Sequence, residues 1–438
     1  MKKRNMKTRI LACIAVLVVC TAHAQEILTV EDAVRITLEN NYDIKISANE
    51  LKVDQTNATI GNAGMLPRVS ATVVDNNGIQ YSSQTRNDGT VNRLNNATNN
   101  SLNYGVGLGW TIFDGFGMFA RYDQLKEIEK LGQTQYRLMV QTRVGDVMTA
   151  YYDLVQQQQQ LKALDTTMII SRERVELAQN RFTIGKASKL EVLNAQVDLN
   201  TDQTNLVRQK ELYANTKTRL NELMGRDTQL DFVVSESVAV DQHLQLGELT
   251  NLAEKQNPEL QAQLISKRIA ELNLKNVRST RYPSIGVSTG YNIIESQSSL
   301  GFTSQAYSRG WTYGFNATLN LFDGLNQNRV EKVAKLQIEN QEYLIAQQNL
   351  TLRSQLTTAY QTYLTNLELT ALEARNEEIA EQNLQITLDK FRIGTITTLE
   401  FRTAQLNYIN AKVRNSNAQF QAKLSEVALR QLAGNLSF

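Results

Sequence analysis

The sequence predicts a mainly α-helical protein that also contributes strands to a membrane β-barrel and consists of two copies of one structural unit. Three observations lead to this prediction. Landmark motifs recur along the 438 residues at a nearly constant spacing, and only three prolines interrupt long tracts of helix-forming residues. Several short segments alternate large apolar residues with small or polar ones, which is the pattern of β-strands.

The N-terminus predicts export. A basic start is followed by the apolar run ILACIAVLVVC and by Ala22-His23-Ala24, the three parts of a secretory signal peptide. We expect cleavage after Ala24, so that residues 1–24 form the signal peptide. The alternative is a lipoprotein acylated at Cys20, but Val19 stands where that processing requires a small residue.

Cleavage changes the composition of the exported chain. Both cysteines are lost, so we expect no disulfide. Five basic residues are lost as well, which leaves 46 − 5 = 41 Lys and Arg against 44 Asp and Glu, a net charge of −3 that implies no nucleic-acid partner. After Leu28 no apolar run approaches the roughly 20 residues of a transmembrane helix.

The exported chain lacks the residue types of a chemical site. His243 is its one histidine, with no cysteine or second histidine to complete a transition-metal site. The sequence also contains no phosphate-binding glycine loop, and its G-x-S-x-G match, GVSTG at 286–290, lies inside an alternating segment that is typical of a strand. We therefore expect no enzyme activity, no cofactor and no metal.

The motif RFTIGKASKLEVLNAQ at 181–196 returns as KFRIGTITTLEFRTAQ at 390–405, 209 residues later and with seven of sixteen positions identical. The same shift relates IFDG at 112–115 to LFDG at 321–324. A period this long exceeds that of solenoid repeats, about 20–50 residues, and indicates two large copies. We expect the first repeat over 25–240 and the second over 241–438.

Upstream of the FDG motifs the shift is 216 residues. It relates Asn41 to Asn257 and Pro67 to Pro283. The first copy therefore carries seven extra residues between its proline and its FDG motif.

Each repeat is expected to contain the same elements in the same order. A helical stretch comes first, over residues 29 to about 60 and 246 to about 280. A β-hairpin follows, at about 66–113 and about 282–322, and then a long helical hairpin that ends near 225 and 434. A single helix from about 116 to 181 would be roughly 100 Å long. Its apolar residues recur at mixed three- and four-residue steps, as in coiled coils. Its glutamines leave two alternatives open for the assembly of the long helices, a hollow tunnel or a solid coiled-coil stalk.

The strands predict how the chain meets a membrane. In YGVGLGWTI at 104–112, large apolar residues share one face, and glycines and a threonine share the other. A soluble β-sandwich is the alternative, but the strand length, the aromatic ends and the signal peptide favour a membrane barrel. Four strands per chain cannot close a barrel, and open edges are not tolerated in hydrocarbon. Two chains would supply eight strands and three would supply twelve; glycine and asparagine at the lumen positions favour three.

The repeated motif predicts a tight turn between two helices. Gly185 and Gly394 fit the left-handed conformation that ends a helix. Ser188 and Thr397 follow, each with a glutamate three residues later, which is the capping box that starts the next helix. The motif therefore reverses the chain at the far end of each long hairpin.

With these motifs, the chain resembles TolC-family outer-membrane efflux proteins (outer-membrane factors). The resemblance rests on the signal peptide, the two-fold repeat, the LP and YP strand starts, the FDG turns, and the RFxxG and KFxxG tips with their following Leu, Glu and Ala-Gln. It covers essentially the whole exported chain. It implies a homotrimer that shares a 12-stranded β-barrel in outer-membrane lipid and a long α-helical coiled-coil tunnel in the periplasm.

The resemblance also implies a function and partners. The protein would be the passive exit duct of a tripartite efflux or type I secretion system. Its partners would be a periplasmic adaptor (membrane fusion) protein and an inner-membrane transporter of the RND or ABC type. The alternative is a trimeric barrel-anchored coiled-coil adhesin or structural protein. Adhesins of that kind collect their strands at the C-terminus, whereas these hairpins are internal.

Site residues follow from the resemblance. Glu400 matches one of two acidic positions at the periplasmic entrance; the other falls on Thr403, a departure from a double carboxylate ring. Glu191 is the counterpart of Glu400 in the first tip, and capping alone is the alternative for both glutamates. The adaptor would dock at the tips, represented by Phe182, Gly185, Lys186, Lys189, Phe391 and Gly394. Packing inside the hairpin is the alternative for both phenylalanines, and solvation is the alternative for both lysines.

Overall fold

The computed structural model describes residues 27–299 and 303–436. The predicted signal peptide and Cys20 lie outside these residues. The chain divides into two compact units, each of which takes residues from both sequence repeats. The strand unit comprises residues 49–134 and 262–346, and the helical unit comprises the remaining described residues.

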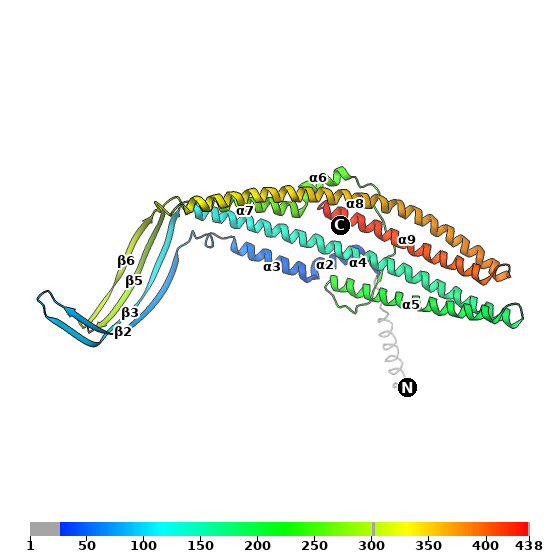
Figure 1. Cartoon of the computed structure of the whole chain (residues 1–438), viewed down its shortest axis with the longest axis horizontal. Coiled ribbons are helices and arrows are strands. Elements are labelled where there is room, and N and C mark those ends of the chain that lie inside the picture. Colours follow the sequence, from blue (N-terminus) through cyan, green and yellow to red (C-terminus); the bar gives the residue numbers. More distant parts are fainter. Residues whose placement is uncertain (1–26, 300–302, 437–438) are drawn as a thin grey trace, which may run out of the picture. The chain divides into compact units, whose positions relative to one another are not determined.

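The strand unit contains one antiparallel four-stranded sheet in the order β2-β3-β5-β6 (Figure 1). Its strands are β2 (Arg68–Thr85), β3 (Val91–Asp114), β5 (Ser284–Ser298) and β6 (Gln305–Thr318). Both predicted hairpins are therefore present, although β6 ends about four residues before the expected 322. Among the described residues, β2 pairs only with β3 and β6 only with β5, so the sheet ends in two edges.

The register confirms the two different faces of the sheet. Val106, Tyr291 and Trp311 lie opposite one another across three strands, and the rings of Tyr291 and Trp311 pack edge to face with centroids 5.5 Å apart. One residue further along, Gly107, Gly290 and Thr312 form the next row. Because side chains alternate between faces, one face is large and apolar and the other is small or polar.

The seven extra residues lengthen the first hairpin. The strands β2 and β3 have 18 and 24 residues, against 15 and 14 for β5 and β6. The last partner of β3 in β5 is reached at Asn99, so the end of this hairpin is two-stranded. A register shift between Gln80 and Ser82 lies opposite Asn96, whose φ of 57° marks a β-bulge.

Most of the described chain is helical. The helices of the first repeat are α2 (Val30–Asn40), α3 (Tyr42–Asn57), α4 (Gly117–Thr183) and α5 (Lys189–Leu223). Those of the second are α6 (Leu246–Gln256), α7 (Pro258–Ser279), α8 (Asn326–Ile393) and α9 (Thr398–Leu432). Within the described residues, we find no helix whose length and apolar character would let it cross a membrane.

Each predicted N-terminal helical stretch is two helices rather than one, because an asparagine interrupts it. The Asn41 side chain accepts hydrogen bonds from the backbone N–H groups of Asp43 and Ile44, at 2.9 and 3.1 Å, and so caps α3. Its amide nitrogen donates to the Leu223 carbonyl at 2.8 Å, which satisfies the C-terminal end of α5.

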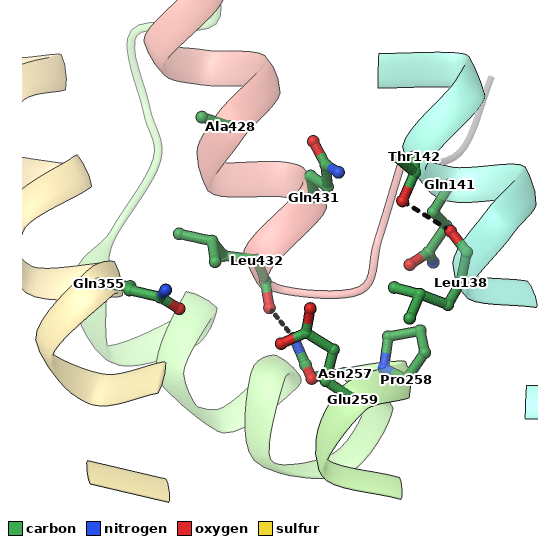
Figure 2. Close-up of a pocket in the computed structure, with 10 residues that line it drawn as sticks. All are labelled: Leu138, Gln141, Thr142, Asn257, Pro258, Glu259, Gln355, Ala428, Gln431 and Leu432. Atoms are coloured by element: carbon green, nitrogen blue, oxygen red, sulfur yellow. Dashed lines mark hydrogen bonds between the residues drawn. The ribbon is translucent and has the colours of Figure 1, made fainter. Parts of the chain in front are cut away.

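The second repeat contains the same junction. Asn257 accepts from the N–H of Leu260 at 3.0 Å and donates to the Leu432 carbonyl at 2.9 Å. Figure 2 shows this amide directed at the end of α9, beside Pro258. A Cβ on Gly434, which has a φ of +71°, would lie 2.6 Å from the Gln256 carbonyl oxygen. The backbones approach too closely for any other residue.

The core of the helical unit lies where α4 and α5 meet α2 and the connector after α5. Tyr151, Leu154 and Leu220 are among its fully buried members. The short parallel pair β1 (Ile27–Leu28) and β4 (Val233–Val234) closes over this core. The Tyr151 hydroxyl donates to the Leu28 carbonyl at 2.9 Å, which ties the strand pair to α4.

Candidate functional site: the hairpin tips

Both tips begin with the same helix ending. At the first tip Lys186 N–H donates to the Arg181 carbonyl at 2.8 Å, and Gly185 N–H to the Phe182 carbonyl at 3.0 Å. This pair of bonds is a Schellman motif, and Gly185 has the left-handed φ of +77° that it requires. Equivalent bonds form around Gly394, whose φ is +84°. The predicted left-handed conformation of both glycines at the helix ends is confirmed.

The helix starts that follow differ between the tips. Thr397 accepts the Glu400 N–H at 3.2 Å, and the Glu400 carboxylate accepts the Thr397 N–H at 3.0 Å, which completes a capping box. At the first tip Ser188 accepts the Glu191 N–H at 3.3 Å. There the Glu191 carboxylate turns to the second tip instead and accepts the Thr398 hydroxyl. The predicted capping box is thus confirmed in full at Glu400. At Glu191 only one of its two bonds is present, the one from the Glu191 N–H to the Ser188 hydroxyl.

The two tips of one chain are tied together by Arg181. Its guanidinium donates to the Phe391 carbonyl, in the last turn of α8, at 3.0 Å. It also lies 5.0 Å from the centroid of the Phe391 ring and 3.8 Å from the Glu191 carboxylate. A cation at a helix C-terminus satisfies carbonyls and complements the helix dipole. A Cβ on Gly394 would lie 2.7 Å from Arg181 Nη2, so a larger residue there would displace the end of this side chain.

An ion pair also joins the two hairpins near their tips. Arg392 donates to both carboxylate oxygens of Glu173, at 2.8 and 3.1 Å. The hydrogen bond to Glu173 raises the pKa of Arg392, which therefore stays charged. Both side chains are almost half exposed, so this pair contributes little to stability.

The two phenylalanines have different surroundings. Phe391 is buried and stacks on Phe401, with ring centroids 4.9 Å apart, inside an apolar cluster with Leu384. Its side chain is therefore not available to another protein, and packing inside the hairpin is its role. Phe182 is 37 % exposed and carries the Lys189 ammonium 5.4 Å from its ring centroid.

The remaining candidate residues lie at the surface of the tips. Lys186, Gly185 and Gly394 are exposed, as are Glu400 and Thr403 one turn apart on α9. Four apolar residues that the sequence reasoning did not single out are also strongly exposed: Ile184, Leu190, Ile393 and Leu399. They flank the glycines and precede the glutamates, so the repeated motif did contain the signal.

Behind the tips lies a buried polar network that the sequence reasoning missed. Arg402 donates from two nitrogens to the two carboxylate oxygens of Asp202, both at 2.8 Å. The Ser171 hydroxyl donates to the same carboxylate at 2.6 Å, and Gln405 donates to Ser171 at 2.9 Å. Asp202 is 3 % exposed and Gln405 is fully buried. The network connects α9 to both helices of the first hairpin.

Nothing at the tips suggests bond-making chemistry. In the described part of the chain we find no group of three or more His, Cys, Asp or Glu side chains arranged to hold a metal ion. His243 is exposed in the connector before α6, where its backbone N–H donates to Asp241 at 3.0 Å. The tips instead present exposed apolar, basic and acidic side chains, and contacts of Arg181 and Arg392 hold the two hairpins together.

Comparisons with known proteins are consistent with this architecture. The family model described as outer membrane efflux protein matches residues 33–226 and 249–435. The outer membrane protein TolC of Vibrio cholerae is 25 % identical over 324 residues, which cover 72 % of this chain and 73 % of that protein. Protein CyaE of Bordetella pertussis is 23 % identical over 341 residues, which cover 76 % of this chain and 70 % of that protein.

Solved structures share the fold. The CmeC outer membrane channel of Campylobacter jejuni superimposes with a TM-score of 0.76 at 17 % identity, covering 93 % of this chain and 85 % of that one. The open state of the Neisseria gonorrhoeae MtrE outer membrane channel gives a TM-score of 0.72 at 14 % identity, covering 93 % and 89 %. Since the family model spans far more than half of the sequence, the chain belongs to the outer membrane efflux protein family, whose members are passive outer-membrane channels and not enzymes.

Proposed function

We propose that three copies of this chain close one twelve-stranded barrel in the outer membrane and continue it as an α-helical tunnel into the periplasm. The observation that supports this proposal is the four-stranded sheet. It has one apolar and one small, polar face, and it ends in two edges, β2 and β6. Hydrocarbon does not tolerate unpaired strand edges, so four strands require partners from other copies. A twelve-stranded barrel places the apolar face toward lipid and leaves a bore lined by small residues.

The tunnel would act as a passive exit duct of a tripartite efflux or type I secretion system. Its energy would come from an inner-membrane transporter, linked to it by a periplasmic adaptor that docks at the tips. The exposed residues Phe182, Lys186 and Lys189 of the first tip are suited to such a contact. The second tip has threonine at both positions equivalent to the lysines, so the two docking surfaces would differ in charge. Cross-linking from Lys186 in cells, followed by identification of the captured protein, tests this contact.

The entrance would be lined by Glu400 of each copy. Three like charges around a narrow opening favour cations. Replacement of Glu400 by glutamine should therefore reduce the cation selectivity of the channel in planar bilayers, measured as a shift in reversal potential across a salt gradient. The matched control is Glu248→Gln, because Glu248 is an exposed glutamate on α6, away from the tips. An unchanged reversal potential for the Glu400 variant would refute the entrance role. Absence of conducting trimers from the unaltered protein would refute the duct itself.

A further inference from the structure

The small, polar face of the sheet carries an isolated arginine near the point where β3 leads into α4 (Figure 1). Arg68, the first residue of β2, lies opposite Gly109. The same row continues through Ser288 to Gly314. In the rows of this face from Arg68 to Asn76, every other residue is glycine, alanine, serine, threonine, asparagine, valine or isoleucine. Arg68 therefore supplies the only charge on this stretch of the face.

The guanidinium of Arg68 lies over a part of the sheet with little side-chain bulk. The side chain is exposed, and it forms no ion pair and no side-chain hydrogen bond with another described residue. A Cβ placed on Gly109 would meet no heavy atom within 4 Å. A recess of about 700 Å³ lies here, and Arg68, Ser288 and Asn316 are among the residues that line it. The structure thus leaves both the charge and the space beside it available to a solute.

Only the first repeat contains this arginine. By the 216-residue shift, Arg68 corresponds to Ser284, the first residue of β5. The acid at the end of β3, Asp114, is already paired with Arg121 at 2.7 Å. A closed assembly of three copies would therefore have three arginines on its small, polar face.

We propose that the three Arg68 side chains form a cationic ring in the bore of the barrel and select cargo that carries carboxylate, phosphate or sulfate groups. The inference rests on the proposed barrel, in which this face lines the bore. Rings of arginine or lysine favour anions in pores. The guanidinium also presents paired N–H donors that match the oxygens of such groups. Because the neighbours in its row are glycine and serine, an anionic group reaches the guanidinium without displacing other side chains.

Ion selectivity tests the ring. Arg68→Gln should raise the cation selectivity of the channel in planar bilayers, measured as the reversal potential across a KCl gradient. This shift is opposite in sign to the one expected of Glu400→Gln, because the two rings carry opposite charges. Arg68→Lys keeps the charge and should keep the reversal potential. Arg309→Gln is the matched control, since Arg309 is an exposed arginine of β6 on the opposite face of the same sheet, opposite Ile293.

Block by an organic anion gives a second readout. Citrate added to the bath should reduce the current through the unaltered protein and through Arg309→Gln. The block should be several-fold weaker in Arg68→Gln and intermediate in Arg68→Lys, because an ammonium is a point charge without the paired donors of a guanidinium.

A further variant keeps Arg68 in place and neutralises the ring. Gly109→Asp places a carboxylate directly opposite Arg68, in space that no heavy atom occupies within 4 Å. It should weaken the citrate block and raise the cation selectivity as Arg68→Gln does. It decides the question if Arg68→Gln fails to form trimers.

The outcomes separate the ring from the duct. Conducting Arg68→Gln or Gly109→Asp channels with the reversal potential and citrate block of the unaltered protein would overturn the ring and leave the duct intact. Equal shifts in Arg68→Gln and Arg309→Gln would reveal a general effect of net charge, which would also overturn it. Absence of conduction by the unaltered protein would instead refute the duct on which the ring depends.

Discussion

Replacement of Arg402 by alanine should lower the free energy of local opening between the second tip and the first hairpin by about 3–5 kcal/mol. The reason is that the substitution leaves a buried carboxylate without its cation. Arg402 supplies two N–H donors to Asp202 at 2.8 Å, and Asp202 is 3 % exposed. Water cannot easily replace these donors at such a site. The Ser171 hydroxyl remains as a third donor at 2.6 Å, so the lower part of this range is expected.

A double variant separates the burial of an unpaired charge from the contribution of the contact. With Arg402→Met and Asp202→Leu combined, no ionised group of this pair remains in the interior, and the cost should be far smaller than that of Arg402→Ala alone. Arg353→Ala is the matched surface control. Arg353 pairs with Glu254 at 2.7 Å, but its side chain is 65 % exposed, and such pairs contribute about 0–1 kcal/mol.

Amide hydrogen exchange of the purified channel measures these local free energies. A loss of about 3 kcal/mol corresponds to a roughly hundredfold fall in protection, since each 1.4 kcal/mol is a factor of ten. The fall should appear in peptides covering 195–205 and 398–410. The reasoning would be refuted if Arg402→Ala changed protection no more than Arg353→Ala. It would equally be refuted if the double variant were less protected than the single one.

Three further predictions concern the turns and the core. Gly394→Ala should destabilise the second tip more than Gly185→Ala does the first, because both glycines have a positive φ but only Gly394 lies against Arg181; hydrogen exchange at the two tips compares them. Asn257→Ala removes the cap of α7 and the partner of the Leu432 carbonyl and should cost about 1–3 kcal/mol, measured by urea unfolding against the exposed Asn251→Ala. Burial raises the pKa of Tyr152 to about 12, so its neutral form stabilises the fold fully below pH 10, and this contribution is lost as the pH rises from about 10 to 12. Tyr152→Phe should reduce the loss of stability between pH 10 and 12, and an unchanged profile would contradict this.

Features encoded within a few neighbouring residues could be predicted from the sequence. The Schellman glycines and the Thr397–Glu400 capping box depend on bonds that span three to five residues, so the motif alone contains them. The faces of the strands follow from a period of two, and the register of β3 with β5 preserves them. Constant spacing of the landmarks then identified equivalent elements before any packing was known.

Features that depend on distant partners could not be predicted in this way. The residues around Asn41 are compatible with one continuous helix. The breaks at Asn41 and Asn257 are stabilised by the carbonyls of Leu223 and Leu432, which lie 182 and 175 residues away in the sequence. Pro258 did carry a local signal, since proline favours the first position of a helix.

The buried network behind the tips shows why a repeated chain must lose its symmetry where its copies meet. By the 209-residue shift, Arg402 corresponds to Leu193, Asp202 to Ala411 and Ser171 to Ala380. If both copies kept arginine at the first position and aspartate at the second, two of the four charges would have no partner in a single contact between hairpins. An unpaired charge in such an interior costs several kcal/mol. The network therefore depends on the apolar counterparts of Arg402, Asp202 and Ser171 in the other copy, whereas Gln405 corresponds to Gln196. The same reasoning applies to Thr398, which corresponds to Lys189 and whose hydroxyl donates to the Glu191 carboxylate of the other tip. Positions at which two aligned repeats differ in charge thus indicate contacts between the copies, whereas the shared positions indicate the turns within each.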